Sequence, residues 1–323
     1  MSAVSEKSFA IVGLGGAARD WLECAAELPE LALVAGVDPD PARRAEMEAR
    51  GAHAFASVNE LLAVAGAPHV AILCTPPALR LELAEPLLRA GVDLLIEPPL
   101  ATIPDDADRI AELAERSDRL AMTIGRFRGD RGLRDAAGRV AAGAIGRLAA
   151  VEIALSAKRD ARADWRGDPA QSGGGVWLEL GGDALEIAEA LAGTVQRIRM
   201  LDCARVQGGE VEDEVRIETE HAGGVVGLVR LSWNEHLARP LARCIGDRGE
   251  LSLGWAQSRL SREDGEREAV AGPRDPSAMR VEVLRQFLAE RRSRERCIDP
   301  GAQSLAWLHA AYRSFSTKRF EIA

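Results

Sequence analysis

The chain has 323 residues, which is long for one ordinary domain and about right for two. With 47% hydrophobic and 28% charged residues it can bury a sizeable core, and a formal net charge of −9 argues against nucleic acid as the main partner. No run of about 18 uncharged apolar residues predicts a membrane helix, and the first ten residues lack the apolar region of a secretory signal, so we expect a cytoplasmic protein.

The cysteines and histidines do not suggest a metal site. The five cysteines are scattered without a CxxC motif, and we expect reduced, mostly buried thiols. The five histidines are isolated, and no His/Cys pair has the spacing of metal ligands, so we predict no metal. These residues are Cys24, Cys74, Cys203, Cys244, Cys297, His53, His69, His221, His236 and His309.

Through about residue 125, short apolar segments alternate with helical ones. The pattern predicts strands at 8–13, 31–38, 52–55, 69–75, 92–97 and 120–125, and helices at 17–30, 40–51, 58–66, 78–91 and 103–117. Near-continuous apolar strands separated by helices are typical of a parallel sheet covered on both faces. We assign residues 1–123 to this α/β domain.

The turn after the first predicted strand has the pattern G-x-G-x-x-A. Gly13 permits a tight turn, Gly15 lets the backbone approach a pyrophosphate, and Ala18 permits close packing of helix on strand. The following helix N-terminus offers unpaired N–H groups to phosphates. The alternative is a glycine-rich turn in an α/β domain that binds no ligand. The pattern favours dinucleotide binding by Gly13, Leu14, Gly15, Gly16, Ala17 and Ala18.

Asp38 ends the second predicted strand, about 20 residues beyond the glycines, where a carboxylate can accept a hydrogen bond from a ribose 2′-hydroxyl. A carboxylate there repels a 2′-phosphate, which favours NAD over NADP. Arg43 and Arg44 could bind a phosphate instead. They lie inside the next predicted helix, so we favour a solvated helix face for both.

From about residue 126 the alternation stops. Helices are predicted at 131–146 and 176–193, joined through a strand at 147–156 and a polar loop at 157–175. Alternating segments at 196–207, 214–221, 225–234, 241–247 and 249–255 predict an antiparallel sheet of four to six strands. Residues 261–278 suggest a loop or an edge hairpin, and 280–293 and 301–315 suggest helices. We assign residues 124–323 to a second, α+β domain, with a C-terminal helix able to pack back on the first.

Together these segments resemble the Gfo/Idh/MocA family (glucose–fructose oxidoreductase, inositol dehydrogenase and MocA). The resemblance runs nearly end to end and rests on IVGLGGAA, VAGVD, LCTPPALRLELAEPLLRAGVDLLIEPPLA, AIGRL, DWRGDPAQSGGGVWLELGGDALEIAEALAG, GDRGEL and SLAWLHAAYRS. It implies a Rossmann domain followed by a domain whose open antiparallel sheet often forms dimers or tetramers. It also implies oxidation or reduction of sugars, cyclitols and related compounds with NAD(P), and cofactor contacts from Thr75, Pro76, Glu97 and Pro98.

The sequence departs from the family where a lysine and a histidine are usual. The usual Glu-Lys-Pro motif reads Glu97-Pro98-Pro99, and proline has neither an ionisable group nor an N–H. The frequent histidine after the Thr-Pro turn is Arg80, which we predict to hold an anionic group of the substrate. Lys158 is one of only three lysines and could replace the missing one, although a surface lysine is favoured.

Carboxylates replace the other usual side chains. Glu179, Asp183 and Glu186 stand where the family has an aspartate, a histidine and a second aspartate, and their i, i+4, i+7 spacing puts them on one helix face. Alcohol oxidation needs a base and carbonyl reduction needs an acid, and like-charge repulsion can raise a carboxyl pKa toward that of an acid. We predict catalytic roles for Asp183 and Glu179 and a substrate contact for Glu186. Alternatively, they are ordinary helix carboxylates.

Two aromatic residues and one arginine complete the predicted site. Trp165 and Arg166 match the family's Trp-Arg pair and are predicted to contact substrate, although Arg166 could instead bridge to the loop. Trp177 either walls the pocket or belongs to the core. Cys74 is expected to be a buried strand residue, since no histidine partner is apparent.

Two classes of function follow. We favour an NAD(H)-dependent oxidoreductase that acts by hydride transfer on a sugar, cyclitol or related hydroxy or keto compound, with atypical acid/base residues. The alternative is a catalytically silent dinucleotide-binding regulator or scaffold of the same fold. A small-molecule substrate and a homodimer or homotetramer are expected, with neither nucleic acid nor membrane as partner.

Overall fold

The computed structural model describes residues 7–235, 240–272, 274–293 and 300–323, which form two compact units. The first contains the chain through Ile124 together with Ser277–Ala302, and the second contains Gly125–Pro276 and Gln303–Ala323. Cys297 and His236 lie outside the described residues, so the expectations for them are not addressed.

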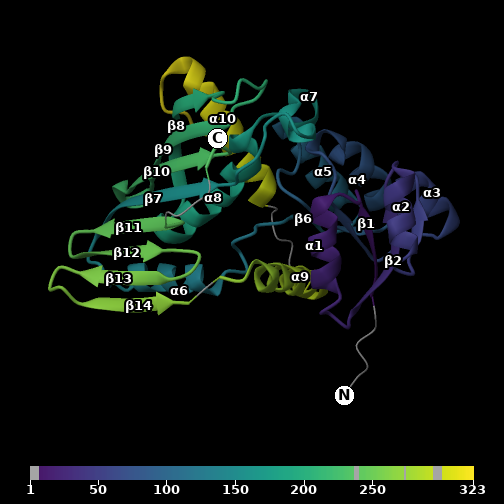
Figure 1. Cartoon of the computed structure of the whole chain (residues 1–323), viewed down its shortest axis with the longest axis horizontal. Coiled ribbons are helices and arrows are strands. Elements are labelled where there is room, and N and C mark those ends of the chain that lie inside the picture. The colour runs from purple at the N-terminus through teal and green to yellow at the C-terminus, as the bar shows by residue number, and fades with distance from the viewer. Residues whose placement is uncertain (1–6, 236–239, 273, 294–299) are drawn as a thin grey trace. The chain divides into compact units, whose positions relative to one another are not determined.

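The first unit is built on a six-stranded parallel sheet with the order β3-β2-β1-β4-β5-β6 (Figure 1). This is the order of a dinucleotide-binding Rossmann sheet, and it confirms the predicted parallel α/β fold. The strands are β1 (Lys7–Val12), β2 (Leu31–Val37), β3 (His53–Phe55), β4 (Val70–Leu73), β5 (Asp93–Ile96) and β6 (Ala121–Thr123). The helices between them are α1 (Gly16–Ala25), α2 (Pro41–Glu48), α3 (Val58–Val64), η1 (Pro77–Leu79), α4 (Arg80–Arg89) and α5 (Pro104–Arg116).

Local sequence explains where two of these helices begin. Asp40 caps α2 by accepting a hydrogen bond from the N–H of Ala42 at 2.9 Å, and Pro41 fits the first helical position. Ser57 caps α3 by accepting from the N–H of Glu60 at 3.1 Å. These helices cover a sheet in which every residue of the central strands β4 and β5 is buried, and all of these residues except Asp93 are apolar.

Helix α9 (Pro276–Ser293) joins the first unit from much later in the chain. Val281, Leu284 and Phe287 lie in the hydrophobic cluster that also holds Ile11 of β1 and Trp21 of α1. The sequence pattern assigned this segment to the second domain, apart from the expectation that a C-terminal helix can pack back on the first. The packing stabilises α1, the helix that follows the glycine turn.

The second unit is built on an eight-stranded sheet with the order β14-β13-β12-β11-β7-β10-β9-β8 (Figure 1). Neighbouring strands are antiparallel except β7 and β10, which are parallel. The predicted antiparallel sheet is confirmed as a mostly antiparallel one, with one parallel pair and with eight strands where four to six were expected. The strands are β7 (Leu148–Ser156), β8 (Val195–Ala204), β9 (Glu214–His221), β10 (Val226–Ser232), β11 (Ala242–Gly246), β12 (Gly249–Leu253), β13 (Ser258–Arg262) and β14 (Arg267–Ala271).

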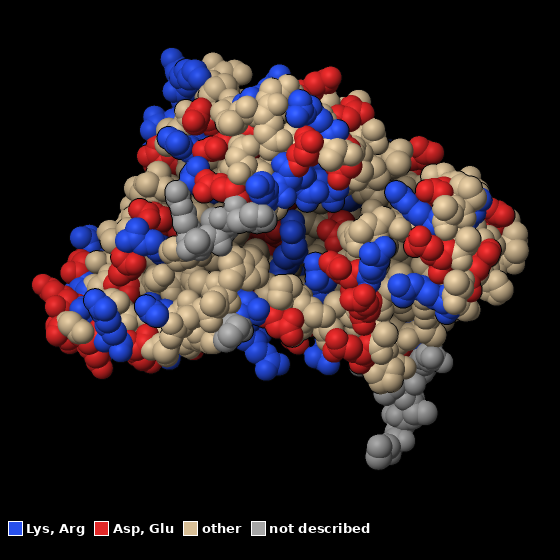
Figure 2. Space-filling model, viewed as in Figure 1, with Lys and Arg blue, Asp and Glu red and all other residues tan. Residues whose placement is uncertain are grey.

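Two of the additional strands come from the polar segment after β12. Of the two structures expected there, a loop or an edge hairpin, this segment forms the edge hairpin β13–β14. Acidic and basic side chains are mixed over this hairpin (Figure 2), as in the Arg262–Glu266 ion pair at 2.6 Å. Charged side chains suit an edge strand because they discourage pairing with another chain. A polar composition here is therefore compatible with regular strands.

Helix α8 (Val176–Ala192) lies against β7, β8, β9 and β10, and α6 (Arg131–Ala141) lies against β12 and β14, on one face of the sheet (Figure 1). Side chains of β10 alternate accordingly: Val229 and Leu231 are buried, whereas Val226 and Leu228 are exposed. The unit also contains η2 (Trp165–Gly167), α7 (Pro169–Ser172), η3 (Ala222–Gly224) and α10 (Pro300–Thr317). Across the described ranges, no helix combines the length and apolar character needed to cross a membrane.

Candidate functional site

Gly13 lies at the carboxyl end of β1, at the point where the strand order of the first unit reverses between β1 and β4. Its φ of +87° belongs to the left-handed region. A Cβ at this position would lie 2.9 Å from the carbonyl oxygen of Cys74 and 2.9 Å from Cγ2 of Thr75. Both the conformation and the close approach of the two strand ends therefore require glycine. Ligands of open α/β sheets bind at this switch point.

Helix α1 begins directly after the turn with no side-chain cap at its N-terminus. Gly15 occupies the capping position, and a Cβ on Gly16 would meet no atom within 4 Å. Ala18 is buried, which lets the helix pack closely on the sheet. The first N–H groups of α1 are thus left for a ligand, and the open approach over Gly16 leaves room for a phosphate.

Asp38 follows β2 and is buried. Its Oδ2 accepts from the N–H of Leu14 at 2.8 Å, and its Oδ1 accepts from the N–H of Asp40 at 2.9 Å. Arg43 donates to Oδ2 at 3.3 Å. A carboxylate has about four lone-pair sites, so one remains for a ribose hydroxyl. The residue fits the role predicted for it.

The two arginines after Asp38 do not simply form a solvated helix face, which was the favoured expectation. Arg43 reaches back toward the turn, and its Nη1 would lie 3.9 Å from a Cβ on Gly15. Arg44 donates to the carbonyl oxygens of Asp38 and Pro39 at 2.9 and 2.8 Å. Arg43 thus places a positive charge beside the carboxylate that is predicted to favour NAD over NADP.

The turns after β4 and β5 supply the other predicted cofactor residues. Thr75 is buried, and its hydroxyl has no hydrogen-bond partner among the described residues. A buried hydroxyl without a partner at the switch point fits a site that a ligand completes. Glu97 accepts a hydrogen bond from the indole Nε1 of Trp21 at 2.5 Å, and the Pro98–Pro99 peptide is cis. Pro76 stands half-buried beside Thr75.

Arg80 corrects one prediction. The side chain is 1% exposed, and its guanidinium donates to the carbonyl oxygen of Thr75 at 2.8 and 3.2 Å and to those of Glu97 and Pro99. The guanidinium therefore joins the turn after β4 to the turn after β5. Because its donors serve backbone carbonyls inside the first unit, Arg80 supports the cofactor turns and is not a substrate ligand.

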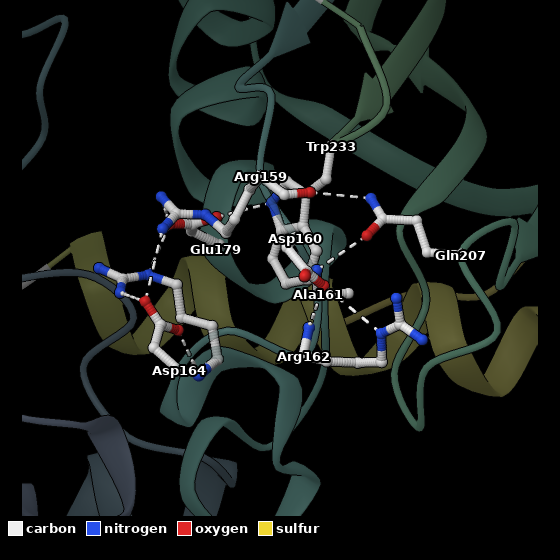
Figure 3. Close-up of polar contacts among 9 residues, drawn as sticks. Arg159, Asp160, Ala161, Arg162, Asp164, Glu179, Gln207 and Trp233 are labelled. Atoms are coloured by element: carbon white, nitrogen blue, oxygen red, sulfur yellow. Dashed lines mark hydrogen bonds and ion pairs between the residues drawn. The ribbon is translucent and has the colours of Figure 1, made fainter.

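In the second unit, Glu179 stands in the first turn of α8 and receives three donors (Figure 3). Arg159 and Arg166 donate to its Oε1 at 3.2 and 3.0 Å, and the indole of Trp233 donates to its Oε2 at 2.7 Å. Asp164 pairs with the same two arginines at 3.7 and 2.9 Å. Since both oxygens of Glu179 are engaged, this carboxylate anchors the arginines rather than standing free as a base.

The loop that carries these arginines is held by a second set of polar contacts (Figure 3). Gln207 accepts from the N–H of Ala161 at 2.9 Å and donates to the carbonyl of Arg159 at 2.8 Å and to Asn234 at 2.9 Å. Asp213 accepts from the N–H of Gln207 at 2.7 Å. The loop is thus tied to the connection between β8 and β9 and to the segment after β10.

Asp183 and Glu186 lie farther along the same face of α8. Asp183 is buried and forms an ion pair with Arg126 at 2.8 Å. Glu186 accepts a hydrogen bond from the N–H of Phe127 at 3.2 Å, and its Oε1 would lie 2.6 Å from a Cβ on Gly125. Burial, and secondarily the charge of Asp183, raise the pKa of Glu186 to about 7. The predicted effect of like charges is thus present at Glu186.

The N-terminus of α8 depends on a residue that the sequence pattern did not single out. Glu212 is buried and accepts from the N–H groups of Gly175 and Trp177 at 3.0 and 3.1 Å and from the hydroxyl of Tyr312 at 2.7 Å. Burial raises the pKa of Glu212. A glutamate paired with a helix N-terminus 36 residues earlier leaves no local signal. The same holds for Arg126, Arg159 and Trp233.

The remaining predicted residues are placed as follows. Lys158 is exposed, as expected of a surface lysine. Arg166 stacks over Trp165 at 4.4 Å, and both are half-buried. Trp177 belongs to the core, since it is fully buried and donates to the carbonyl of Leu308 at 2.9 Å. Burial raises the pKa of Cys74 well above its usual value, which keeps the thiol protonated. No group of three possible metal ligands occurs in the described part of the chain.

A model of an oxidoreductase family with an NAD-binding Rossmann fold matches residues 7–124, and the Gfo/Idh/MocA C-terminal domain matches residues 133–252. The chain belongs to the Gfo/Idh/MocA oxidoreductase family. A relative from Amycolatopsis mediterranei (strain S699), named "Putative UDP-kanosamine synthase oxidoreductase subunit", is 30% identical over 258 residues, which are 72% of this chain and 70% of the relative.

Solved structures of other Gfo/Idh/MocA proteins share the fold over nearly the whole chain. Levoglucosan dehydrogenase in complex with NADH and levoglucosan has a TM-score of 0.86 at 16% identity, covering 99% of both chains. GenD2 from gentamicin A biosynthesis, in complex with NAD, has 0.83 at 22%, covering 100% of this chain and 98% of that one. The WlbA dehydrogenase of Bordetella pertussis, with NADH and UDP-GlcNAcA, has 0.79 at 20%, covering 99% and 98%. The predicted family is confirmed, and the model that matches the first unit is that of an NAD-binding Rossmann fold, as predicted for the cofactor.

Proposed function

We propose that this Gfo/Idh/MocA protein is an NAD(H)-dependent oxidoreductase that transfers hydride to or from a sugar, cyclitol or related hydroxy or keto compound. One observation carries the proposal: α8 holds two neighbouring carboxyl groups that are fixed by other residues. Asp183 forms an ion pair with Arg126, and Glu186 accepts a hydrogen bond from the N–H of Phe127. A scaffold that only binds a dinucleotide would not need such a site. Pro98 stands where the family usually has a lysine, so carboxyl groups are the candidates for proton transfer.

We assign the residues the following roles. When bound, NAD+ would accept the hydride from the substrate carbon. The glycine turn binds its pyrophosphate, Asp38 accepts from its ribose, and the Thr75 hydroxyl lies unpartnered at the same switch point. A carboxyl group of α8 takes the hydroxyl proton during oxidation and returns it during reduction. Leu14, Gly16, Ala17, Pro76, Glu97 and Pro98 remain proposed cofactor contacts.

A sugar-like substrate is supported by the names of the relatives, which include a UDP-kanosamine synthase subunit and levoglucosan dehydrogenase. Trp165 and Arg166 are proposed to contact the substrate. An aromatic ring with a guanidinium stacked 4.4 Å above it offers an apolar face and hydroxyl-binding donors together. Both side chains are half-buried.

We also propose a homodimer or homotetramer through the sheet face opposite α8. Val226 and Leu228 are exposed there at 36% and 42%, next to the paired charges of Glu152 and Arg243 at 2.8 Å. Apolar side chains flanked by matched charges suit a protein interface. Light scattering on the eluting protein measures the mass, and a value of 34.6 kDa would contradict the proposal.

The activity is tested in two stages. The purified protein is first titrated with NADH and NADPH while nicotinamide fluorescence is followed, and we expect tighter binding of NADH. Oxidation of NADH is then followed against a panel of keto sugars, and reduction of NAD+ against sugars, cyclitols and nucleotide sugars. NADH binding without turnover of any panel compound would favour the silent regulator. The absence of the usual lysine, whose position is occupied by Pro98, also fits that alternative.

A further inference from the structure

Glu186 differs from the other two carboxyl groups of α8 in its surroundings. Both oxygens of Glu179 are engaged by two guanidinium groups and an indole N–H. Asp183 is 4% exposed and is paired with Arg126 at 2.8 Å. Glu186 is half-buried and receives one described hydrogen bond, from the N–H of Phe127 at 3.2 Å. Of the three, Glu186 is therefore the partly exposed carboxyl group that forms no ion pair with an arginine among the described contacts.

Few charges face Glu186. Asp183 lies one turn earlier on α8, and Arg126 and Arg128 come from the segment between β6 and α6. Arg126 forms an ion pair with Asp183 at 2.8 Å. Helix α6, which packs on α8, buries the apolar residues Leu133, Ala136 and Val140. The strands beneath α8 also bury apolar side chains, as Ile153, Ile217 and Val229 show.

These surroundings change the protonation of Glu186. Burial and the charge of Asp183, which is paired with Arg126, raise the pKa of Glu186 to about 7. A group that exists in both forms at neutral pH is suited to accept and to donate a proton.

We propose that Glu186 is the proton-transferring residue of this site, and that the Asp183–Arg126 pair is a positioning element that sets its protonation. The proposal rests on the proposed oxidoreductase function. In oxidation, the substrate O–H bond breaks and its proton moves to a Glu186 carboxylate oxygen. Bound NAD+ would accept the C–H hydride with its electron pair as the carbon–oxygen double bond forms. In reduction, Glu186 returns the proton to the carbonyl oxygen.

Carboxyl titration tests this without any substrate. In protein labelled with 13C at the glutamate carboxyl carbons, the NMR signal that disappears in Glu186→Gln belongs to Glu186, and we expect it to titrate near pH 7. Asp183→Asn removes the neighbouring negative charge and should move this titration to lower pH. Arg126→Gln should move it to higher pH, and because Arg126 is 38% exposed this variant also serves if Asp183→Asn does not fold.

The pH dependence of kcat/KM provides the second readout, with a panel compound that turns over. Glu186→Gln should lower kcat/KM at least 100-fold and remove the titration near neutral pH, and Asp183→Asn should shift that titration to lower pH. Glu189→Gln is the matched control, because it makes the same change on α8. Glu189 accepts a hydrogen bond from the N–H of Val195 at 3.1 Å, and the amide oxygen of glutamine can accept the same bond. This variant should leave kcat/KM and its pH dependence unchanged.

The outcomes separate the two proposals. Wild-type kcat/KM with an unchanged pH profile in Glu186→Gln would overturn the role of Glu186 and leave the oxidoreductase function standing. A Glu186 signal that titrates near the ordinary glutamate value of 4.5 would overturn it as well. NADH binding without turnover of any panel compound by the wild-type protein would instead overturn the oxidoreductase function, and the catalytic role with it.

Discussion

The carboxylate of Asp38 accepts a hydrogen bond from the backbone N–H of Leu14 at 2.8 Å, so the residue after β2 holds the glycine turn after β1. Arg43 donates to the same oxygen at 3.3 Å. The side chain proposed to bind the ribose and the turn proposed to bind the pyrophosphate are therefore joined by a hydrogen bond. A change at Asp38 should affect both cofactor choice and turn geometry.

Asp38→Ser should reverse the cofactor preference. The substitution removes the charge that repels a 2′-phosphate and leaves the guanidinium of Arg43 beside the site. A hydrogen bond to a charged group contributes about 1.5–3 kcal/mol, so NADH affinity should fall roughly tenfold or more, and NADPH affinity should rise by a similar factor. Fluorescence titration measures both. The double variant Asp38→Ser/Arg43→Ala should lose the gain for NADPH, and an equal NADPH affinity in single and double variants would exclude Arg43.

Gly13→Ala should destabilise the first unit. At φ +87° a Cβ is strained, and it would lie 2.9 Å from the carbonyl of Cys74. We expect a loss of about 1–3 kcal/mol in the free energy of unfolding, with loss of NADH binding. Urea unfolding measures the first effect. Gly16→Ala is the control, because nothing lies within 4 Å of its Cβ and it begins α1, and its stability should be unchanged or slightly higher. Equal stability of Gly13→Ala and wild type would contradict this account.

The parallel sheet, the glycine turn and Asp38 could be predicted because their signals are local. Apolar runs such as the one that forms β4 stand next to the turn residues that end them, and the spacing from Gly13 to Asp38 follows from one β-α-β unit. The three carboxylates of α8 were likewise placed on one face by helical periodicity. These predictions need only the sequence neighbourhood of each residue.

The role of Arg80 could not be predicted in the same way. An arginine beside a Thr-Pro turn favours a ligand-facing guanidinium, yet its donors meet the carbonyls of Glu97 and Pro99, 17 and 19 residues later. Glu212 and Gly175, at the start of α8, are joined over a longer separation of 37 residues. Such pairings depend on how separate turns meet at the end of a sheet, which single-residue patterns do not encode. The place of helix α9 in the first unit likewise depends on contacts between segments far apart in the sequence, so it could not be predicted from local patterns.

Arg80→Met should therefore weaken folding and not substrate binding alone. The change leaves the carbonyls of Thr75, Glu97 and Pro99 without their buried donor, and each buried unsatisfied group costs about 1–3 kcal/mol. We expect at least ~3 kcal/mol lower free energy of unfolding in urea. Arg89→Met is the control: its side chain is 65% exposed and pairs with Glu85 on the surface, so it should change stability by less than about 1 kcal/mol. Unchanged stability with a raised KM in Arg80→Met would restore the substrate role.

The raised pKa of Glu186 also predicts a pH-dependent stability. The folded protein holds a proton on this group up to about pH 7, whereas the unfolded chain loses it near 4.5. Stability from this source is fully present below pH 4.5 and is lost as pH rises to about 7. Glu186→Gln has no proton to lose, so relative to wild type it should gain roughly 1–3 kcal/mol between pH 4.5 and pH 8. Urea unfolding at a series of pH values measures the difference, with Glu189→Gln as control. A difference independent of pH would show that Glu186 titrates normally in the folded protein.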